Sequence, residues 1–321
     1  MNDSSSNSAS SASLDLAIQS TSEDASICKK YAVSKGYWKD NNISHMVKGI
    51  TSRKEPEINR GYYARNESIW MLLKQFISMN NGQCQIISLG AGLDTLFWRM
   101  IDENCLPLKF LEIDFGEVVS KKLHMIKQSK VLQDKLNNVS MNVDSLTSDI
   151  YSFLKCDLRD ISQLSSVLIA NGAVKSKPTL VLAECVLIYM PVCSSKDIIK
   201  WVAEYFTDSV FINYEPFNMN DSFGRTMINN LKARQCWLVG QDACQSVSTE
   251  KERFLENGWH SVVCENMWTV YNSLPERRNI ERIEFLDETE LFQQLLVHYC
   301  LCIAIKETSD LNLIALTDFL S

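Results

Sequence analysis

Short apolar runs alternate with longer amphipathic stretches along most of the chain. Seven of these runs have the length and composition of buried β-strands, at 84–89, 109–113, 152–156, 179–183, 210–214, 259–264 and 298–305. Helical patterns fill most of the gaps between them. Strands that alternate with helices in this way predict an α/β fold with a doubly wound, mainly parallel sheet of seven strands. We expect the last two runs to pair with each other at one edge, with the final strand inserted antiparallel.

The chain before the first strand divides into a polar tail and two helices. Residues 1–22 are crowded with Ser and Asn and offer almost nothing to bury, so we expect a disordered tail there. Helical patterns follow at 23–33 and 61–79, and we expect residues 23–321 to form one domain. Polar sequence at 216–253 predicts an insertion near the C-terminal ends of the strands, a lid or substrate collar. The stretch 127–151 carries no motif and predicts an irregular connection.

The first predicted strand runs into a Gly-Ala-Gly turn at residues 90–92 and then into a helical pattern. Glycine has no Cβ, so backbone N–H groups in such a turn can approach a ligand closely. Asp114 ends the next predicted strand. In folds of this kind, an acidic side chain at that place accepts hydrogen bonds from the two hydroxyls of a ribose. Gly90 and Asp114 together therefore indicate a site for a nucleoside cofactor. The alternative is an ordinary strand–turn–helix junction of an α/β protein.

The turn lacks one feature that dinucleotide sites need. A third glycine normally lets the helix pack closely on the strand, with a pyrophosphate at the helix N-terminus. Thr95 occupies that place here. A cofactor without phosphates, such as S-adenosylmethionine, needs only the first tight turn and the acidic residue. The absence of the third glycine therefore favours a methyltransferase over a dehydrogenase.

Composition narrows the range of partners and compartments. The chain of 321 residues has a net charge of −7, which argues against nucleic acids and other partners that bind by phosphate neutralisation. Neither a signal peptide nor a membrane span is evident, so we expect no membrane partner. The 11 cysteines include no Cys-x-x-Cys pair and the 4 histidines are scattered. We therefore expect no metal, a reducing compartment, namely the cytoplasm, and a monomer.

Six segments together closely resemble the leucine carboxyl methyltransferase family. They are DASICK at 24–29, SKGYW at 34–38, PEINRGYYAR at 56–65, LGAGLDT at 89–95, CDLRD at 156–160 and AECVLIYM at 183–190. The likeness extends from about residue 23 to residue 305 and continues through 213–215, 221–224 and 284–288. The resemblance implies a class I methyltransferase fold, S-adenosylmethionine as methyl donor, and a protein α-carboxylate as acceptor. The family's acceptor is the C-terminal leucine of the protein phosphatase 2A catalytic subunit.

The resemblance also implies which residues bind the cofactor. They are Lys29 and Arg65 at its carboxylate, Gly90 under its methionine part, Asp114 at the ribose hydroxyls, Asp157 with the backbone of Leu158 at adenine, and Glu184 near the methionine amino group or the ribose. Each has an ordinary alternative. Lys29 and Arg65 could be surface charges, and Asp157 could cap the helix that follows it. Glu184 stands in apolar surroundings, where a carboxylate needs a partner.

Methyl transfer to a carboxylate needs little acid–base help. An α-carboxyl group has a pKa of about 3.3–3.7, so the nucleophile is already ionised at neutral pH and needs no general base. Catalysis then depends on orienting the donor and the acceptor relative to each other. A side chain that binds the acceptor carboxylate, which we call its anchor, is therefore needed. The candidates are Arg159, through its planar guanidinium, and Tyr189, through its phenol. A surface ion pair for Arg159 and a core position for Tyr189 are the structural alternatives.

Two other functions remain open from the sequence. One is a class I methyltransferase that acts on a different acceptor, such as a small acid or a modified tRNA base. The other is a catalytically silent cofactor-binding scaffold. The charge of the chain weighs against tRNA, and the presence of Gly90, Asp114, Asp157 and Glu184 weighs against a silent scaffold.

Overall fold

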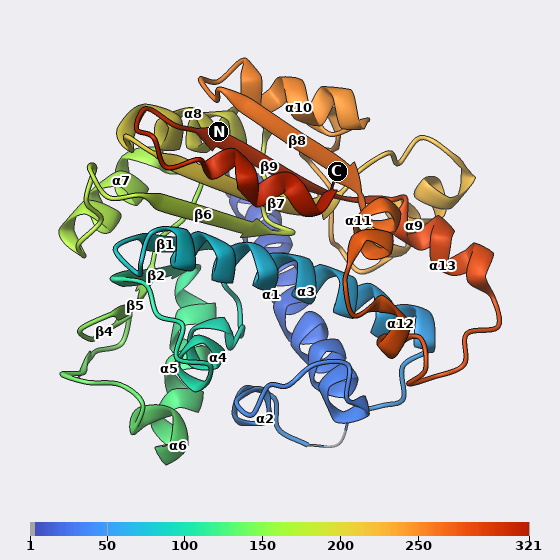
Figure 1. Cartoon of the computed structure of the whole chain (residues 1–321), viewed down its shortest axis with the longest axis horizontal. Coiled ribbons are helices and arrows are strands. Elements are labelled where there is room, and N and C mark those ends of the chain that lie inside the picture. The colour runs from blue at the N-terminus through green and yellow to red at the C-terminus, as the bar shows by residue number, and fades with distance from the viewer. Residues whose placement is uncertain (1–3, 50, 321) are drawn as a thin grey trace.

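A mixed sheet of nine strands forms the centre of the protein (Figure 1). The computed structural model describes residues 4–49 and 51–320. The strands are β1 (Gln85–Leu89), β2 (Lys109–Asp114), β3 (Ser140–Met141), β4 (Ser145–Thr147), β5 (Tyr151–Lys155), β6 (Thr179–Glu184), β7 (Ser209–Pro216), β8 (Ser261–Asn266) and β9 (Tyr299–Lys306). Their order across the sheet is β3-β4-β5-β2-β1-β6-β7-β9-β8.

The five central strands, β5, β2, β1, β6 and β7, pair in parallel. The prediction for the last two strands is confirmed, because β8 and β9 pair antiparallel at one edge. β9 lies between β8 and β7 and is antiparallel to both. The predicted count of seven strands was too low, since the short strands β3 and β4 form an antiparallel extension on β5. Both lie in the stretch 127–151, where the sequence carried no motif.

Helices cover both faces of the sheet. They are α1 (Ser4–Lys35), α2 (Ile43–Met46), α3 (Pro56–Met79), α4 (Leu96–Asp102), α5 (Gly116–Gln128), α6 (Lys130–Gln133), α7 (Ile161–Ala170), α8 (Val192–Tyr205), α9 (Ser222–Ala233), α10 (Val247–Leu255), α11 (Met267–Ser273), α12 (Arg277–Ile280) and α13 (Thr289–Leu296), with 3₁₀ turns η1 (Leu187–Tyr189), η2 (Gln241–Ala243) and η3 (Leu313–Leu320).

Alternate residues of each central strand face two separate apolar cores. In β1, Ile86 packs into the core under α3, α4 and α5, whereas Ile87 packs into the core under α7, α8 and α10. Successive side chains of a strand point to opposite faces, so a strand buried on both faces is apolar throughout. This explains why the central strands appeared in the sequence as continuous apolar runs.

Over residues 4–22 the structure shows a helix where the sequence predicted a disordered tail; residues 1–3 of that prediction lie outside the described residues. A single helix, α1, runs through Ser4–Lys35 and continues into the segment where a helix was expected. Asp15, Ile18 and Ser22 are half-buried against the body of the protein. A Ser-rich segment has little tendency to form a helix alone, but contacts with the rest of the fold can stabilise one. Composition alone therefore misjudged this segment.

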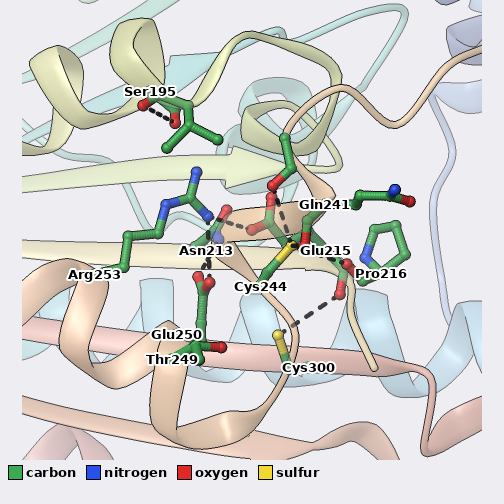
Figure 2. A network of polar contacts seen from close by, with 12 residues as sticks. Ser195, Asn213, Glu215, Pro216, Gln241, Cys244, Thr249, Glu250, Arg253 and Cys300 are labelled. Atoms are coloured by element: carbon green, nitrogen blue, oxygen red, sulfur yellow. Dashed lines mark hydrogen bonds and ion pairs between the residues drawn. The ribbon is translucent and has the colours of Figure 1, made fainter. Parts of the chain in front are cut away.

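The segment predicted as an insertion, 216–253, carries α9, η2 and most of α10. A buried polar network joins α10 to β7 (Figure 2). Arg253 Nη1 lies 2.6 Å from Glu215 Oε1 and 3.2 Å from Glu250 Oε2, and Asn213 Nδ2 donates to Glu250 Oε1 at 2.8 Å. These contacts fix α10, at the end of the insertion, to the strand from which the insertion departs.

Two further observations concern the environment of the protein. Across the described ranges 4–49 and 51–320, the helices are all too short or too polar to cross a membrane. All eleven cysteines have free thiols, and most are buried, where a thiol packs as a small apolar group.

Candidate active site

Two adjacent cavities open at the C-terminal ends of β1, β2 and β6. The charged cavity, of about 250 Å³, is lined by Lys29, Arg65, Asp94 and Glu184 among others. The apolar cavity, of about 90 Å³, is lined by Phe115, Val118, Leu158 and Met190, and also by Asp114, Asp157 and Arg159. Gly90, Cys185, Tyr189, Thr21 and Ser22 line both. All nine residues predicted for the site line one or both of these cavities, at the edge of the sheet where open α/β folds bind ligands.

The turn after β1 requires its glycines. Gly90 and Gly92 have φ values of +59° and +55°, a left-handed conformation that side chains rarely adopt. A Cβ on Gly90 would lie 2.6 Å from Val186 Cγ2, and one on Gly92 would lie 2.9 Å from Ser22 Cβ. Gly90 therefore lets Val186 pack against the turn, and Gly92 lets α1 approach it.

Asp114 is fixed by the backbone around it. Its carboxylate accepts hydrogen bonds from the N–H groups of Gly92, at 2.6 Å, and Phe115, at 2.8 Å. The side chain is buried at the edge of the apolar cavity, and this burial raises the pKa of Asp114 to about 6. The group is therefore mostly ionised at neutral pH. A carboxylate has about four lone-pair positions, so two N–H donors leave it able to accept from a pair of hydroxyls.

Four charged side chains form a compact cluster in the charged cavity. Lys29 Nζ lies 2.6 Å from Asp94 Oδ2 and 2.9 Å from Glu184 Oε1, and Arg65 Nε donates to the same Glu184 oxygen. Burial opposes ionisation of Glu184, but Arg65 and Lys29 outweigh it and lower its pKa. Burial likewise opposes the charge on Lys29, but Asp94 and Glu184 outweigh it and raise its pKa. Two cations and two anions suit an amino-acid group, which carries one charge of each sign.

Asp94 is a site residue that the sequence-based assignment missed. Its Oδ1 accepts the Leu96 N–H at 2.6 Å while its Oδ2 binds Lys29, so it links the turn to α1. Its position four residues after Gly90, within the same motif, was the only available signal. Tyr62, Tyr214 and Tyr299 were missed as well. The Arg65 guanidinium lies 4.8 Å from the ring centroid of Tyr214 and 5.5 Å from that of Tyr62, so aromatic faces hold this cation in place.

Arg159 lies in the apolar cavity, but both of its donor edges are occupied. Nη1 and Nη2 contact the Asp15 carboxylate at 2.9 and 2.8 Å, while Nε and Nη2 contact the two Asp157 oxygens at 3.1 Å or less. The guanidinium also lies 5.5 Å from the Phe115 ring centroid. Each pair of N–H donors that could bind a carboxylate is already used, one by Asp15 and one by Asp157. The geometry therefore does not favour Arg159 as the anchor of the acceptor carboxylate.

Asp157 and Leu158 line the apolar cavity. Burial would raise the pKa of Asp157, but hydrogen bonds from Arg159 lower it below its usual value. Asp157 does not cap the next helix. The N-cap of α7 is Asp160, whose side chain accepts from the Gln163 N–H at 2.9 Å.

Tyr189 lies in η1, where the two cavities meet. Burial raises the pKa of its phenol well above the usual value, so the hydroxyl stays a neutral hydrogen-bond donor. Cys185, which also lines both cavities, has a φ of +57°. This left-handed conformation directly after Glu184 marks the sharp turn from β6 towards η1, and strain of this kind often accompanies a functional site.

The sheet with its antiparallel β9, the glycine turn and the buried Asp114 define the class: the protein is a class I methyltransferase, and S-adenosylmethionine is its methyl donor. Within that class, the chain belongs to the leucine carboxyl methyltransferase family, whose sequence model matches residues 17–203, more than half of its length.

Curated relatives agree with this assignment. The chain is 45% identical over 311 residues to leucine carboxyl methyltransferase 1 of Bos taurus, covering 94% of each sequence. It is 41% identical over 298 residues to a leucine carboxyl methyltransferase 1 homolog of Arabidopsis thaliana, covering 91% of this chain and 90% of the homolog. It is 30% identical to the tRNA wybutosine-synthesizing protein 4 of Rattus norvegicus, but the match covers only 43% of that longer protein.

Proposed function

We propose that this enzyme transfers a methyl group from S-adenosylmethionine to the α-carboxylate of a C-terminal leucine, and that its acceptor is the catalytic subunit of protein phosphatase 2A. Membership of the leucine carboxyl methyltransferase family supports the reaction. The observation that carries the proposal is the junction of the charged and apolar cavities at Gly90 and Tyr189. A donor and an acceptor can meet there. The buried, free cysteines suit a reducing cytoplasm, where we place the protein.

Each part of the donor has suitable partners in the cavities. Lys29 and Arg65 would bind its carboxylate, Glu184 its amino group, and Asp114 its ribose hydroxyls. Asp157 and the backbone N–H of Leu158 would bind adenine between the apolar walls. The bound donor supplies an electrophilic methyl group on a positively charged sulfur. The protein supplies orientation and a site from which water is largely excluded.

The acceptor oxygen attacks the methyl carbon in line with the departing sulfur. One carbon–oxygen bond forms and one carbon–sulfur bond breaks, giving a methyl ester and S-adenosylhomocysteine. The positive and negative charges cancel and no proton moves, so no residue has to act as a base. A water-poor cavity favours this loss of charge, and alignment of the two reactants can contribute on the order of 7–11 kcal/mol.

Tyr189 is the better of the two predicted anchors for the acceptor. Tyr189 lines both cavities and burial keeps its phenol neutral, whereas Arg159 is held by Asp15 and Asp157. We therefore propose that Tyr189 donates to one oxygen of the acceptor carboxylate and leaves the other free to react. Arg159 would reach the acceptor only if Asp15 released it.

The proposal is tested with the acceptor's own C-terminus. Deleting the terminal leucine of the phosphatase catalytic subunit, or converting its terminal carboxylate to an amide, should abolish methyl transfer because either change removes or displaces the nucleophile. Methylation of the amidated acceptor at the normal rate would contradict the proposal and indicate a side-chain target.

A further inference from the structure

Basic and apolar side chains meet at the rim of the charged cavity, on α9 and the segment that follows it. Leu231 and Arg234 line the cavity itself. Lys232 Nζ lies 5.2 Å from the ring centroid of Trp237, and 42% of the Trp237 surface is exposed. We call these four residues the rim patch. An exposed tryptophan with a lysine over its ring is unusual on the surface of a chain with a net charge of −7.

The rim patch is held close to Tyr189. The Gly240 N–H, three residues after Trp237, donates to the Ile188 carbonyl at 2.8 Å. A Cβ on Gly240 would lie 2.8 Å from the carbonyl oxygen of Leu187, so this segment packs tightly on η1, which carries Tyr189. The rim patch is therefore fixed in position relative to the proposed reaction centre.

An ion pair crosses the mouth of the charged cavity. Arg234 Nη2 contacts the Asp24 carboxylate, so the end of α9 is joined to α1. Both side chains are more than half exposed, and Asp24 also lines the cavity. An exposed pair of this kind contributes little to stability and is readily exchanged for another partner. Asp24 occupies the place that an acidic group of an incoming chain would take.

We infer that the rim patch is a docking surface for the acceptor segment just before the reacting C-terminus, and that this segment carries a carboxylate side chain and an apolar side chain. The inference rests on the proposed function. Arg234 binds the acidic side chain in exchange for Asp24, and Trp237 with Leu231 covers the apolar one. Arginine and tryptophan are the residues that most often dominate the energy of such contacts. The continuity of the patch with the cavity favours this occupant over an unrelated partner.

The test compares acceptor kinetics with donor affinity in variants of the full chain. Arg234→Gln should raise the KM for the phosphatase catalytic subunit about tenfold, with kcat and S-adenosylmethionine affinity nearly unchanged. The salt dependence of KM should weaken in the same variant. Asp24→Asn should lower that KM, because it frees Arg234. Arg278→Gln, which removes an exposed arginine on α12, is the matched control and should change nothing.

A second arm uses acceptors in which the acidic side chains near the C-terminus are replaced by amides. This change should raise KM for the wild-type enzyme and have little further effect on Arg234→Gln, as expected for two groups that interact.

The inference is overturned if Arg234→Gln behaves like Arg278→Gln, or if Arg234→Gln and Asp24→Asn weaken acceptor binding alike, since a purely structural ion pair would give that result. Loss of S-adenosylmethionine binding in Arg234→Gln would assign the residue to the donor instead. If the wild-type enzyme does not methylate the phosphatase at all, the proposed function itself fails.

Discussion

Asp114 is the residue on which donor binding should depend most directly. In the binding mode that we propose, its ionised carboxylate accepts from both ribose hydroxyls, and burial raises its pKa to about 6. Protonation at lower pH removes acceptor positions, so affinity for S-adenosylmethionine should rise as pH increases through about 6 and level off above neutral pH. Calorimetric titration across this range measures the effect.

Asp114→Asn provides the control for this pH dependence. The amide keeps the shape of the side chain but cannot ionise, so binding should weaken by roughly 2–4 kcal/mol and lose its dependence on pH near 6. An unchanged pH profile in the variant would assign the titration to another group. Tight binding of NAD by the wild-type protein would contradict the choice of cofactor.

Variants of Arg159 test whether this residue supports donor binding or anchors the acceptor, two roles that the sequence could not distinguish. Its bonds to Asp15 and Asp157 hold it between α1 and the end of β5, beside the residues that we propose bind adenine. Arg159→Ala should therefore weaken donor affinity, because it releases Asp157 and one contact of α1. Tyr189→Phe should instead lower turnover with donor affinity nearly intact. The opposite pattern, with Arg159→Ala impaired only in acceptor kinetics, would restore Arg159 as the acceptor anchor.

At the scale of single residues, most candidate site residues were assigned from local sequence motifs. Gly90, Asp114 and Glu184 stand at the ends of strands, where the topology fixes what they face. The ion-pair partner of Arg159 could not be predicted in this way. Asp15 lies 144 positions away in the sequence and belongs to a segment with no apolar pattern. No periodicity or spacing predicts an ion pair of that kind.

At the scale of elements, the network between α10 and β7 should affect stability. Burial, with the neighbouring Glu215 as a second cause, raises the pKa of Glu250 from 4.5 to about 8. The folded protein therefore holds a proton that the unfolded chain has released, and the contribution of this group to stability falls as pH rises from about 4.5 to about 8.

Glu250→Gln should remove this part of the pH dependence. The variant cannot release a proton, so its free energy of unfolding relative to wild type should increase with pH across the same window. Urea unfolding at several pH values measures it. Glu252→Gln changes an exposed side chain of the same helix and should leave the pH dependence unaltered. Parallel curves for Glu250→Gln and wild type would show that Glu250 is already ionised in the folded protein.

The elements themselves were predictable where burial was complete and less so elsewhere. Apolar runs placed β1, β2 and β6 to within one residue, because both faces of these strands are buried. The prediction for β8 began two residues early, since this edge strand is only partly buried. The first two turns of α1 and the short strands β3 and β4 had no pattern of their own. β4 forms by pairing with β5, and β3 by pairing with β4.

At the scale of the whole molecule, one cavity brings together charged side chains from distant parts of the chain. The chain is acidic overall, yet Lys29 and Arg65 line the charged cavity, and Lys232 and Arg234 stand at its rim. Lys29 and Arg65 pair with Asp94 and Glu184, and Arg234 pairs with Asp24. Charges of both signs suit a donor whose amino-acid group carries one charge of each sign.

The chemical nature of the methylated product tests this account most directly. The enzyme is incubated with S-adenosylmethionine labelled in its methyl group and with the phosphatase catalytic subunit, and the labelled protein is then treated with mild alkali. A methyl ester hydrolyses under these conditions, so the account predicts that the label leaves the protein as volatile methanol and that none is incorporated when the terminal leucine is absent. Label that stays on the protein after alkali would place the methyl group on nitrogen and contradict transfer to a carboxylate.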